Sequence, residues 1–179
     1  MRTTFPSPER IQSDYASRLA SATPETLRLA REWYVDANTF AHRLCEVRPD
    51  WNMEVSCSVI SALSPRERWD SNKAKALAFA NGEPIRGLGA NLRRAVAAES
   101  HGFAALTGPK TRAFAEAIYG NPFAVVIDTW MLKCIGRKAC TGPQYRLCAD
   151  AVTIVGYAYG LTPRDAQAAI WIVERGSAE

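Results

Sequence analysis

The chain has 179 residues, of which 47% are hydrophobic and 22% are charged, and its formal net charge is +4. This length allows one domain, or two closely packed lobes, with a buried core, and the composition is ordinary for a soluble globular protein. No apolar run approaches the roughly 20 residues that a membrane-spanning helix needs, so no membrane partner is expected. The first residues, MRTTFPSPER, lack the apolar core of a secretory signal, and we therefore expect a cytoplasmic location, the host cytoplasm for a phage-encoded chain.

The cysteines are odd in number and irregular in spacing, which argues against a framework of disulfide bonds. We expect them to be buried or free thiols in a reducing compartment. Their spacing suggests no metal site, and no cofactor is expected. The five residues are Cys45, Cys57, Cys134, Cys140 and Cys148.

The N-terminal part predicts a loose arm over residues 1–8 and then two helices. Ile11, Tyr15 and Leu19 recur on one face of a helix over residues 9–20. Thr23 is a good N-cap, and Pro24 suits the first position of a long amphipathic helix that runs to about residue 47.

The middle of the chain predicts three shorter helices joined by polar turns. Residues 53–63 are apolar and are expected to be a buried helix. A turn over residues 64–69 leads to a helix over residues 72–80, and a glycine-containing approach leads to a helix over residues 90–99.

The stretch from Leu106 to residue 136 carries the most information. Gly108-Pro109 breaks the chain just before Lys110, and a helix is expected from Thr111 to about residue 120. The apolar run 125–127 follows, and Asp128 stands where the next helix needs an N-cap.

The C-terminal part predicts a loop over residues 140–143 and two more helices. A helix over residues 145–159 is followed by Thr162-Pro163-Arg164-Asp165, which suits a capping box, and by a final helix over residues 164–174. No convincing strand is present, so the sequence predicts an all-α fold.

The basic excess is concentrated in one window. Residues 101–149 carry six basic and two acidic residues (6 − 2 = +4), whereas the rest of the chain carries sixteen of each. Such a cluster suits phosphate contacts, which supply most non-specific affinity for DNA. The alternative is a solvated basic face without a partner.

Three motifs in the right order resemble the helix-hairpin-helix DNA glycosylases of the endonuclease III type, over roughly residues 55–140. Lys110-Thr111 and Asp128-Thr129 lie 128 − 110 = 18 positions apart, the spacing between the lysine and aspartate motifs of that family. Ser61-Ala62 followed by Ser71-Asn72-Lys73-Ala74, and Gly87-Leu88 followed by Arg93-Arg94, resemble its other two segments. A divergent phage-type branch that acts on modified thymines is included in this resemblance.

The chain departs from the family pattern in three places. The hairpin between Leu106 and Lys110 is shorter than the family's, Trp130 replaces a histidine, and the excursion between Ala62 and Asn72 is longer. Endonuclease III-like proteins often carry a four-cysteine iron–sulfur cluster near the C-terminus, but no cysteine follows Cys148, so we expect none here.

The resemblance implies two closely packed helical lobes with a central cleft, within one domain over residues 1–179. The central bundle is expected at about 52–140 and the outer lobe at about 9–50 and 144–176. It also implies double-stranded DNA as the partner of a protein that is most simply a monomer.

The resemblance implies roles for individual residues. Lys110 would be an amine nucleophile and Asp128 would activate it or stabilise positive charge on the sugar. A lysine attacks only without its proton, so its pKa must be lowered by its surroundings. The residues expected to contact DNA are Leu106, Gly108, Pro109, Thr111, Arg112, Lys133, Arg137 and Lys138. Those expected to form the base pocket or a wedge are Ser61, Leu63, Trp69, Asn72 and Trp130.

Several alternatives stay open at this stage. Leu63 and Trp69 could equally be core residues. Lys110 could be a solvent-exposed lysine and Asp128 a simple helix cap. The protein could be a DNA N-glycosylase that is also an AP lyase. It could also be a pyrophosphorylase-like or amino-acid:DNA transferase on hypermodified thymine, or a non-catalytic DNA-binding module.

Overall fold

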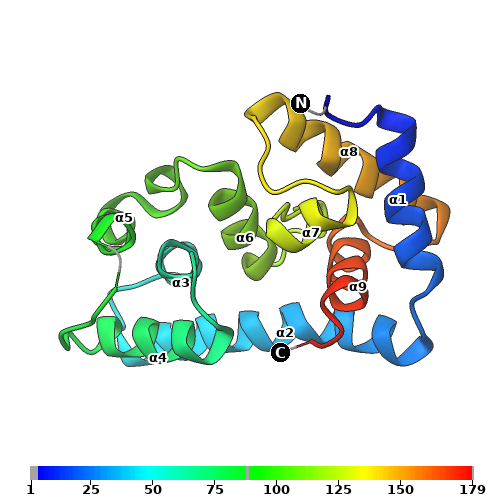
Figure 1. The fold of residues 1–179 in the computed structure, drawn as a ribbon. Helices are drawn as coiled ribbons and strands as arrows, with labels where there is room; N and C mark the ends of the chain where they lie inside the picture. The colour runs from blue at the N-terminus through cyan, green and yellow to red at the C-terminus, as the bar shows by residue number, and fades with distance from the viewer. Residues whose placement is uncertain (1–3, 88, 179) are drawn as a thin grey trace. The chain divides into compact units, whose positions relative to one another are not determined.

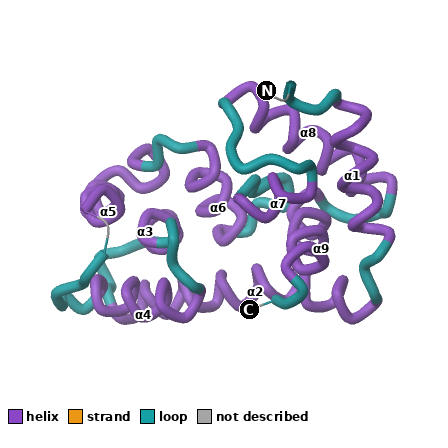
Figure 2. Tube along the Cα trace, in the orientation of Figure 1, coloured by secondary structure: helices purple, strands orange, loops and turns teal. Residues whose placement is uncertain are grey.

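The computed structural model describes residues 4–87 and 89–178, and within them it contains helices and loops but no strand (Figure 2). The predicted all-α fold is confirmed. None of the described helices is long and apolar enough to cross a bilayer. In chain order the helices are α1 (Pro8–Ala20), α2 (Pro24–Val47), α3 (Met53–Leu63), α4 (Trp69–Ala80), α5 (Gly89–His101), the 3-10 helix η1 (Gly102–Ala105), α6 (Pro109–Tyr119), α7 (Thr129–Cys134), α8 (Gly142–Ala158) and α9 (Pro163–Arg175).

The helices form two compact units. Unit 1 combines Met1–Trp33 with Pro122–Ala178, and unit 2 is the continuous segment Tyr34–Asn121. These borders differ from the expected ones, because residues 34–50 belong to unit 2 and residues 122–140 belong to unit 1. Long-range hydrogen bonds explain the second difference: Arg164 N donates to Pro122 O at 3.0 Å, and the Tyr15 hydroxyl donates to Met131 O at 3.2 Å. Part of the predicted arm, residues 1–3, lies outside the described residues.

Helix α3 is the centre of unit 2. It contacts α4, α5, η1 and α6 (Figure 1), and every residue from Val55 to Leu63 is buried. Neighbours on several sides explain why this segment carries only small or apolar residues and does not show a single apolar stripe. Its start is fixed by Asn52, whose side chain accepts from Val55 N at 2.9 Å.

In unit 1, α8 packs against α1 and α9 (Figure 1). The predicted buried face of α1 is confirmed, since Ile11, Tyr15 and Leu19 are all buried. Gly156 is required where α8 meets α9, because a Cβ atom there would lie 2.8 Å from the Cβ of Ala166. Such a contact is too short for two carbon atoms, so a larger residue would push the helices apart.

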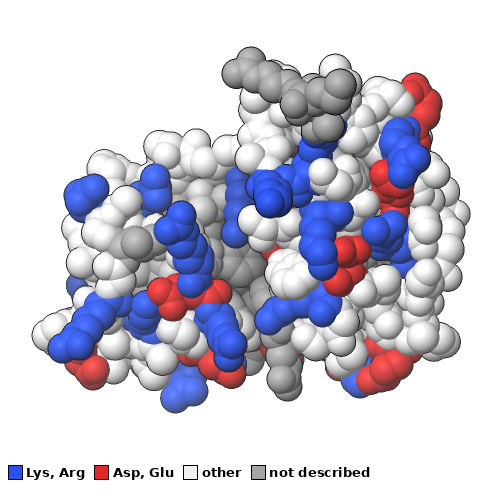
Figure 3. All heavy atoms as spheres, in the orientation of Figure 1, with Lys and Arg blue, Asp and Glu red and all other residues white. Residues whose placement is uncertain are grey.

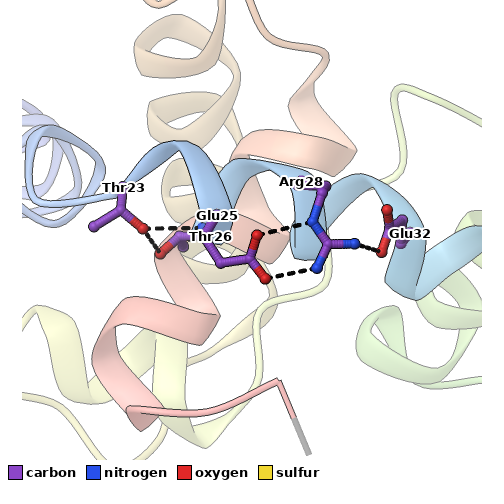
Figure 4. Close-up of polar contacts among 5 residues, drawn as sticks. All are labelled: Thr23, Glu25, Thr26, Arg28 and Glu32. Atoms are coloured by element: carbon purple, nitrogen blue, oxygen red, sulfur yellow. Dashed lines mark hydrogen bonds and ion pairs between the residues drawn. The ribbon is translucent and has the colours of Figure 1, made fainter.

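The first turn of α2 follows the prediction. Thr23 Oγ1 accepts from Thr26 N at 3.1 Å, and the Arg28 guanidinium is held between the carboxylates of Glu25 and Glu32 (Figure 4). Because these ion pairs are exposed, they add little to stability.

The start of α8 was predicted wrongly. The segment 140–143 was expected to be a loop, but α8 already begins at Gly142. Thr141 accepts from Gln144 N, and the Gln144 side chain accepts from Thr141 N, which is a complete capping box. At α9 only half of the predicted box forms, since Thr162 accepts from Asp165 N at 3.1 Å while Asp165 accepts from Arg164.

Candidate functional site

Asp128 is the predicted site residue whose geometry is most closely determined. It is the N-cap of α7, and its Oδ1 accepts hydrogen bonds from Trp130 N at 2.9 Å and Met131 N at 3.0 Å. Its Oδ2 accepts a third hydrogen bond, from Trp171 Nε1 at 3.0 Å. The predicted cap is therefore confirmed, and the half-buried carboxylate is held by three N–H donors.

The extended segment before Asp128 is held by one tyrosine. The Tyr145 hydroxyl donates to Val125 O at 2.9 Å and accepts from Ile127 N at 3.1 Å. Burial raises the pKa of Tyr145 to about 12, so the hydroxyl keeps its proton at neutral pH and can donate it. Because residues 124–127 are also buried, the backbone that leads to Asp128 has a defined position within unit 1.

Glu174 connects α9 to two other helices of unit 1. It accepts from Arg18 Nε of α1 at 3.1 Å, and it pairs with Lys133 Nζ of α7 at 3.3 Å. Burial raises the pKa of Glu174, but the hydrogen bonds from Arg18 and Lys133 outweigh it, so the pKa is lowered overall. Glu174 therefore joins α9, which also carries Trp171, to α7, which begins directly after Asp128.

Lys110 lies in unit 2, in the first turn of α6. Gly108 is the N-cap of this helix but has no side chain that could accept a hydrogen bond from the helix start. The first N–H groups of a helix have no intrahelical partner, so they and the half-buried Lys110 are suited to an anion. Within unit 2, no described carboxylate lies within ion-pair distance of Lys110 Nζ.

The hairpin that precedes α6 is packed against α3 and η1. Ser61 of α3 donates to Thr111 O at 2.6 Å, and Leu106 is buried. Glu54 of α3 accepts from Phe103 N at 3.0 Å. Next to it, Gly102 has φ +50, and a Cβ atom there would lie 2.9 Å from Glu54 Cδ. Glycine is favoured here by the backbone angle, and a Cβ atom would also require the flexible Glu54 side chain to move.

Most of the cations expected to bind DNA already have partners within their own unit. Arg112 pairs with Glu116 and lies over the Phe103 ring at 4.7 Å, and Lys133 pairs with Glu174 and lies over the Trp130 ring at 4.7 Å.

The other predicted DNA contacts vary in exposure. The Arg137 guanidinium lies 5.6 Å from the centre of the Phe5 ring. Lys138 and Pro109 are exposed, and Gly108 and Thr111 are half-buried. Figure 3 shows basic side chains interspersed with acidic ones on the visible face.

Three residues expected at a base pocket or wedge are in the core of unit 2. Ser61, Leu63 and Asn72 are 0%, 4% and 1% exposed. Asn72 Nδ2 donates to Ile60 O at 3.1 Å, which ties α4 to α3. Their burial favours the core interpretation that the sequence left open for Leu63.

The two tryptophans of the predicted pocket differ in their surroundings. Trp69 meets Phe40 and Phe114 edge to face, with ring centres 6.2 and 6.4 Å apart, which favours its interpretation as a core plug of unit 2. Trp130 is half-buried at the start of α7, in contact with Lys133.

The hollows described in unit 2 do not contain Lys110. One of about 450 Å³ is lined by Arg48, Phe79 and Glu99, among others, and the Arg48 guanidinium there is paired with Asp50 and Glu99. A much smaller one, about 10 Å³, has Leu63 in its wall. In the described part of the chain, no three side chains of the metal-binding types are grouped together, and all five cysteines are free thiols.

Sequence reasoning missed Trp171 and Tyr145 as parts of this site. The available signal was weak: a tryptophan or tyrosine that packs against the core from an amphipathic helix usually finds a hydrogen-bond partner for its polar atom. The partners lie 43 positions from Trp171 and 18 and 20 positions from Tyr145, so no local pattern could identify them.

Searches of curated proteins and of solved structures found no match. A family model described as a family of unknown function, DUF7178, matches residues 3–178. The match covers nearly the whole chain, including both units and all the site residues described above. The chain therefore belongs to the DUF7178 family.

Proposed function

We propose that this protein is an enzyme that acts on an extruded base in duplex DNA, most simply an N-glycosylase that is also an AP lyase. The observation that carries the proposal is Asp128, a half-buried carboxylate held by three N–H donors after a buried extended segment. A helix cap needs only one oxygen, so the third donor supports a further role. The sequence motifs that resemble the endonuclease III type supply the reaction class.

Lys110 is assigned as the nucleophile. An amine must lose its proton before it attacks, and a neighbouring carboxylate would oppose that loss. Lys73, Lys75 and Lys133 all pair with acidic residues, whereas Lys110 has no such described partner within unit 2. Among the described residues Lys138 has no acidic partner either, but it lies outside the Lys-Thr motif, so the motif and the missing ion pair together support Lys110 as the reactive amine.

The reaction balances as follows. Lys110 Nζ forms a bond to C1′ of the sugar, the bond from C1′ to the base breaks, and the electron pair leaves with the base, which takes up a proton. Opening of the sugar ring gives a Schiff base. Loss of a proton from C2′ then breaks the C3′–O bond and cleaves the strand. Asp128 would stabilise the positive charge on the sugar.

The phosphate of the extruded nucleotide is assigned to the start of α6. The helix dipole and the N–H groups of its first turn favour an anion there, and Gly108 leaves that end without a capping side chain. Lys138, which is exposed, is the remaining cation expected to contact the backbone of the DNA.

A second candidate is a transferase that modifies the base and leaves the glycosidic bond intact. The observation that favours it is Trp130, which takes the place of the family's histidine and lies against Lys133 at the start of α7. A large ring at this position changes the chemistry available beside Asp128.

Product analysis tests the proposal directly. Unmodified DNA and DNA containing modified thymines are incubated with the protein, and free bases and digested nucleosides are weighed by mass spectrometry. A free base supports the glycosylase, whereas a mass-shifted nucleoside on an intact strand supports the transferase. If no DNA changes, and if Asp128→Asn keeps full DNA affinity and biological activity, the protein is a non-catalytic DNA-binding module.

Borohydride trapping tests the role of Lys110. A duplex with one abasic site should form a covalent adduct with the wild-type protein and none with Lys110→Ala. Lys73→Ala is the matched control, because Lys73 is paired with Asp70 and should leave the adduct unchanged. An adduct that survives in Lys110→Ala would remove this residue from the mechanism.

A further inference from the structure

We infer that Trp171 is the positioning residue for Asp128, and that its indole N–H sets the direction in which the carboxylate meets the substrate. This inference rests on the proposed function, in which Asp128 is the reacting carboxylate. Nothing in the family resemblance assigned a role to α9, and the residue lies 43 positions from its partner.

Capping alone leaves the carboxylate incompletely fixed. The bonds from Trp130 N and Met131 N both end on Oδ1, which is what an N-cap requires. The terminal torsion of an aspartate is broad, so Oδ2 could take several directions about this anchor. The bond from Trp171 Nε1 to Oδ2 at 3.0 Å removes that freedom.

Trp171 is itself held in place on α9. Its ring centre lies 6.2 Å from that of Trp33, at an interplanar angle of 56°, and the Arg175 guanidinium lies over it at 4.7 Å. Because aromatic and cation–π contacts hold the Trp171 ring, its indole N–H has a defined position and direction. A donor with a fixed position can orient its acceptor.

The hydrogen bonds to Asp128 also determine how many of its lone-pair positions remain available to a substrate. A carboxylate has about four lone-pair positions, and the described donors to Asp128 use three of them. The remaining position lies on Oδ2, beside the bond from Trp171. The positive charge on the sugar therefore meets Asp128 in a direction that Trp171 sets.

Nuclear magnetic resonance of the indole N–H groups tests the bond without any substrate. Trp171→Phe identifies the signal of Trp171 among the five tryptophans. Asp128→Ser keeps a good N-cap but lacks Oδ2, so the Trp171 signal should move upfield and exchange faster with solvent in this variant. A signal that is the same in wild type and Asp128→Ser would overturn the inference.

Kinetics test the positioning role. Single-turnover cleavage of the abasic duplex should be about tenfold slower or more in Trp171→Phe, because a hydrogen bond to a charged group is lost. The dissociation constant for the abasic duplex should stay within about twofold of the wild type, so that the loss lies in the rate of the chemical step. A merely structural role would lower the rate and the affinity together.

Trp51→Phe is the matched control, since it removes an indole of unit 2 whose Nε1 has no described hydrogen-bond partner and leaves the bond between Trp171 and Asp128 in place. Its rate should stay within about twofold of the wild type, well below the effect of losing a charged hydrogen bond. Equal loss in both variants, or a Trp171→Phe protein with the wild-type rate, would overturn the inference.

The two proposals fail in different ways. A wild-type protein that neither releases a base nor cleaves the abasic duplex contradicts the proposed glycosylase and lyase, and the inference about Trp171 falls with them. An active wild type with an equally active Trp171→Phe contradicts the positioning role alone. In both cases the resonance experiment independently reports whether the bond exists.

Discussion

At the scale of single residues, Asp128 has a structural and a chemical role that substitution can separate. Asp128→Ala removes the cap of α7 and leaves the Trp171 indole without its acceptor, so we expect it to lower the free energy of unfolding by about 1–3 kcal/mol. Asp128→Asn keeps a capping oxygen and should cost less stability, but it should abolish turnover because the negative charge is lost. Urea denaturation and single-turnover assays measure the two effects.

The comparison between these two variants is the control. If Asp128→Ala were as stable as the wild type, the three hydrogen bonds to the carboxylate would contribute nothing. If Asp128→Asn kept full turnover, the carboxylate would have only its capping role.

Trp69 gives a second prediction at this scale, because a core plug and a base-stacking residue respond differently to truncation. Its contacts with Phe40 and Phe114 predict that Trp69→Ala lowers the free energy of unfolding by about 3 kcal/mol. Tyr157→Ala, at an exposed position, should change it by less than about 0.5 kcal/mol. A stable Trp69→Ala protein with weakened DNA binding would instead support base stacking.

At the scale of elements, the position of residues 124–127 depends on the hydroxyl of Tyr145 in α8, which bonds to Val125 O and Ile127 N. Tyr145→Phe leaves Val125 O and Ile127 N buried without that partner, so we expect a loss of about 1–3 kcal/mol. The Ile127 amide should also exchange faster with solvent. Tyr157→Phe removes an exposed hydroxyl and should change neither quantity. Equal stability of Tyr145→Phe and wild type would show that other contacts position the segment.

The junction of α5 and η1 gives a prediction about close packing. Gly102→Ala brings a Cβ atom within 2.9 Å of Glu54 Cδ at a positive φ, so it should cost about 2–4 kcal/mol. Gly82→Ala is the matched control, because Gly82 has φ +75 with open space around it, and strain alone should cost about 1 kcal/mol. Thermal unfolding compares them, and equal losses would mean that Glu54 moves aside easily.

At the scale of the whole molecule, the proposed partner predicts a salt dependence. The logarithm of DNA affinity should fall linearly with the logarithm of salt concentration, by about 0.9 for each phosphate contact. Lys138→Ala should reduce this slope by about one. Lys133→Ala should reduce it less, because the Lys133 ammonium already pairs with Glu174. Affinity that is insensitive to salt would contradict DNA as the partner.

Local sequence patterns predicted the helices well but predicted their long-range contacts poorly. Helix α3 was expected at residues 53–63 and occupies Met53–Leu63, because the apolar composition of the segment is a local signal. Asp128 was identified as a cap for the same reason. The roles of Tyr145 and Trp171, and the borders of the two units, depend on contacts between distant segments that no local spacing encodes.

The discontinuity of unit 1 has a consequence for how the protein is made. Helix α1 leaves the ribosome before the segment 34–121, yet its partners α8 and α9 are translated after that segment: Arg18 pairs with Glu174, 156 positions later. The apolar face of α1 in the nascent chain therefore stays exposed while the continuous segment 34–121 is translated. An exposed apolar face favours chaperone binding or aggregation during this time. Slowing translation of residues 122–175 should lengthen this vulnerable interval, whereas a circular permutant that places α1 after α9 should shorten it.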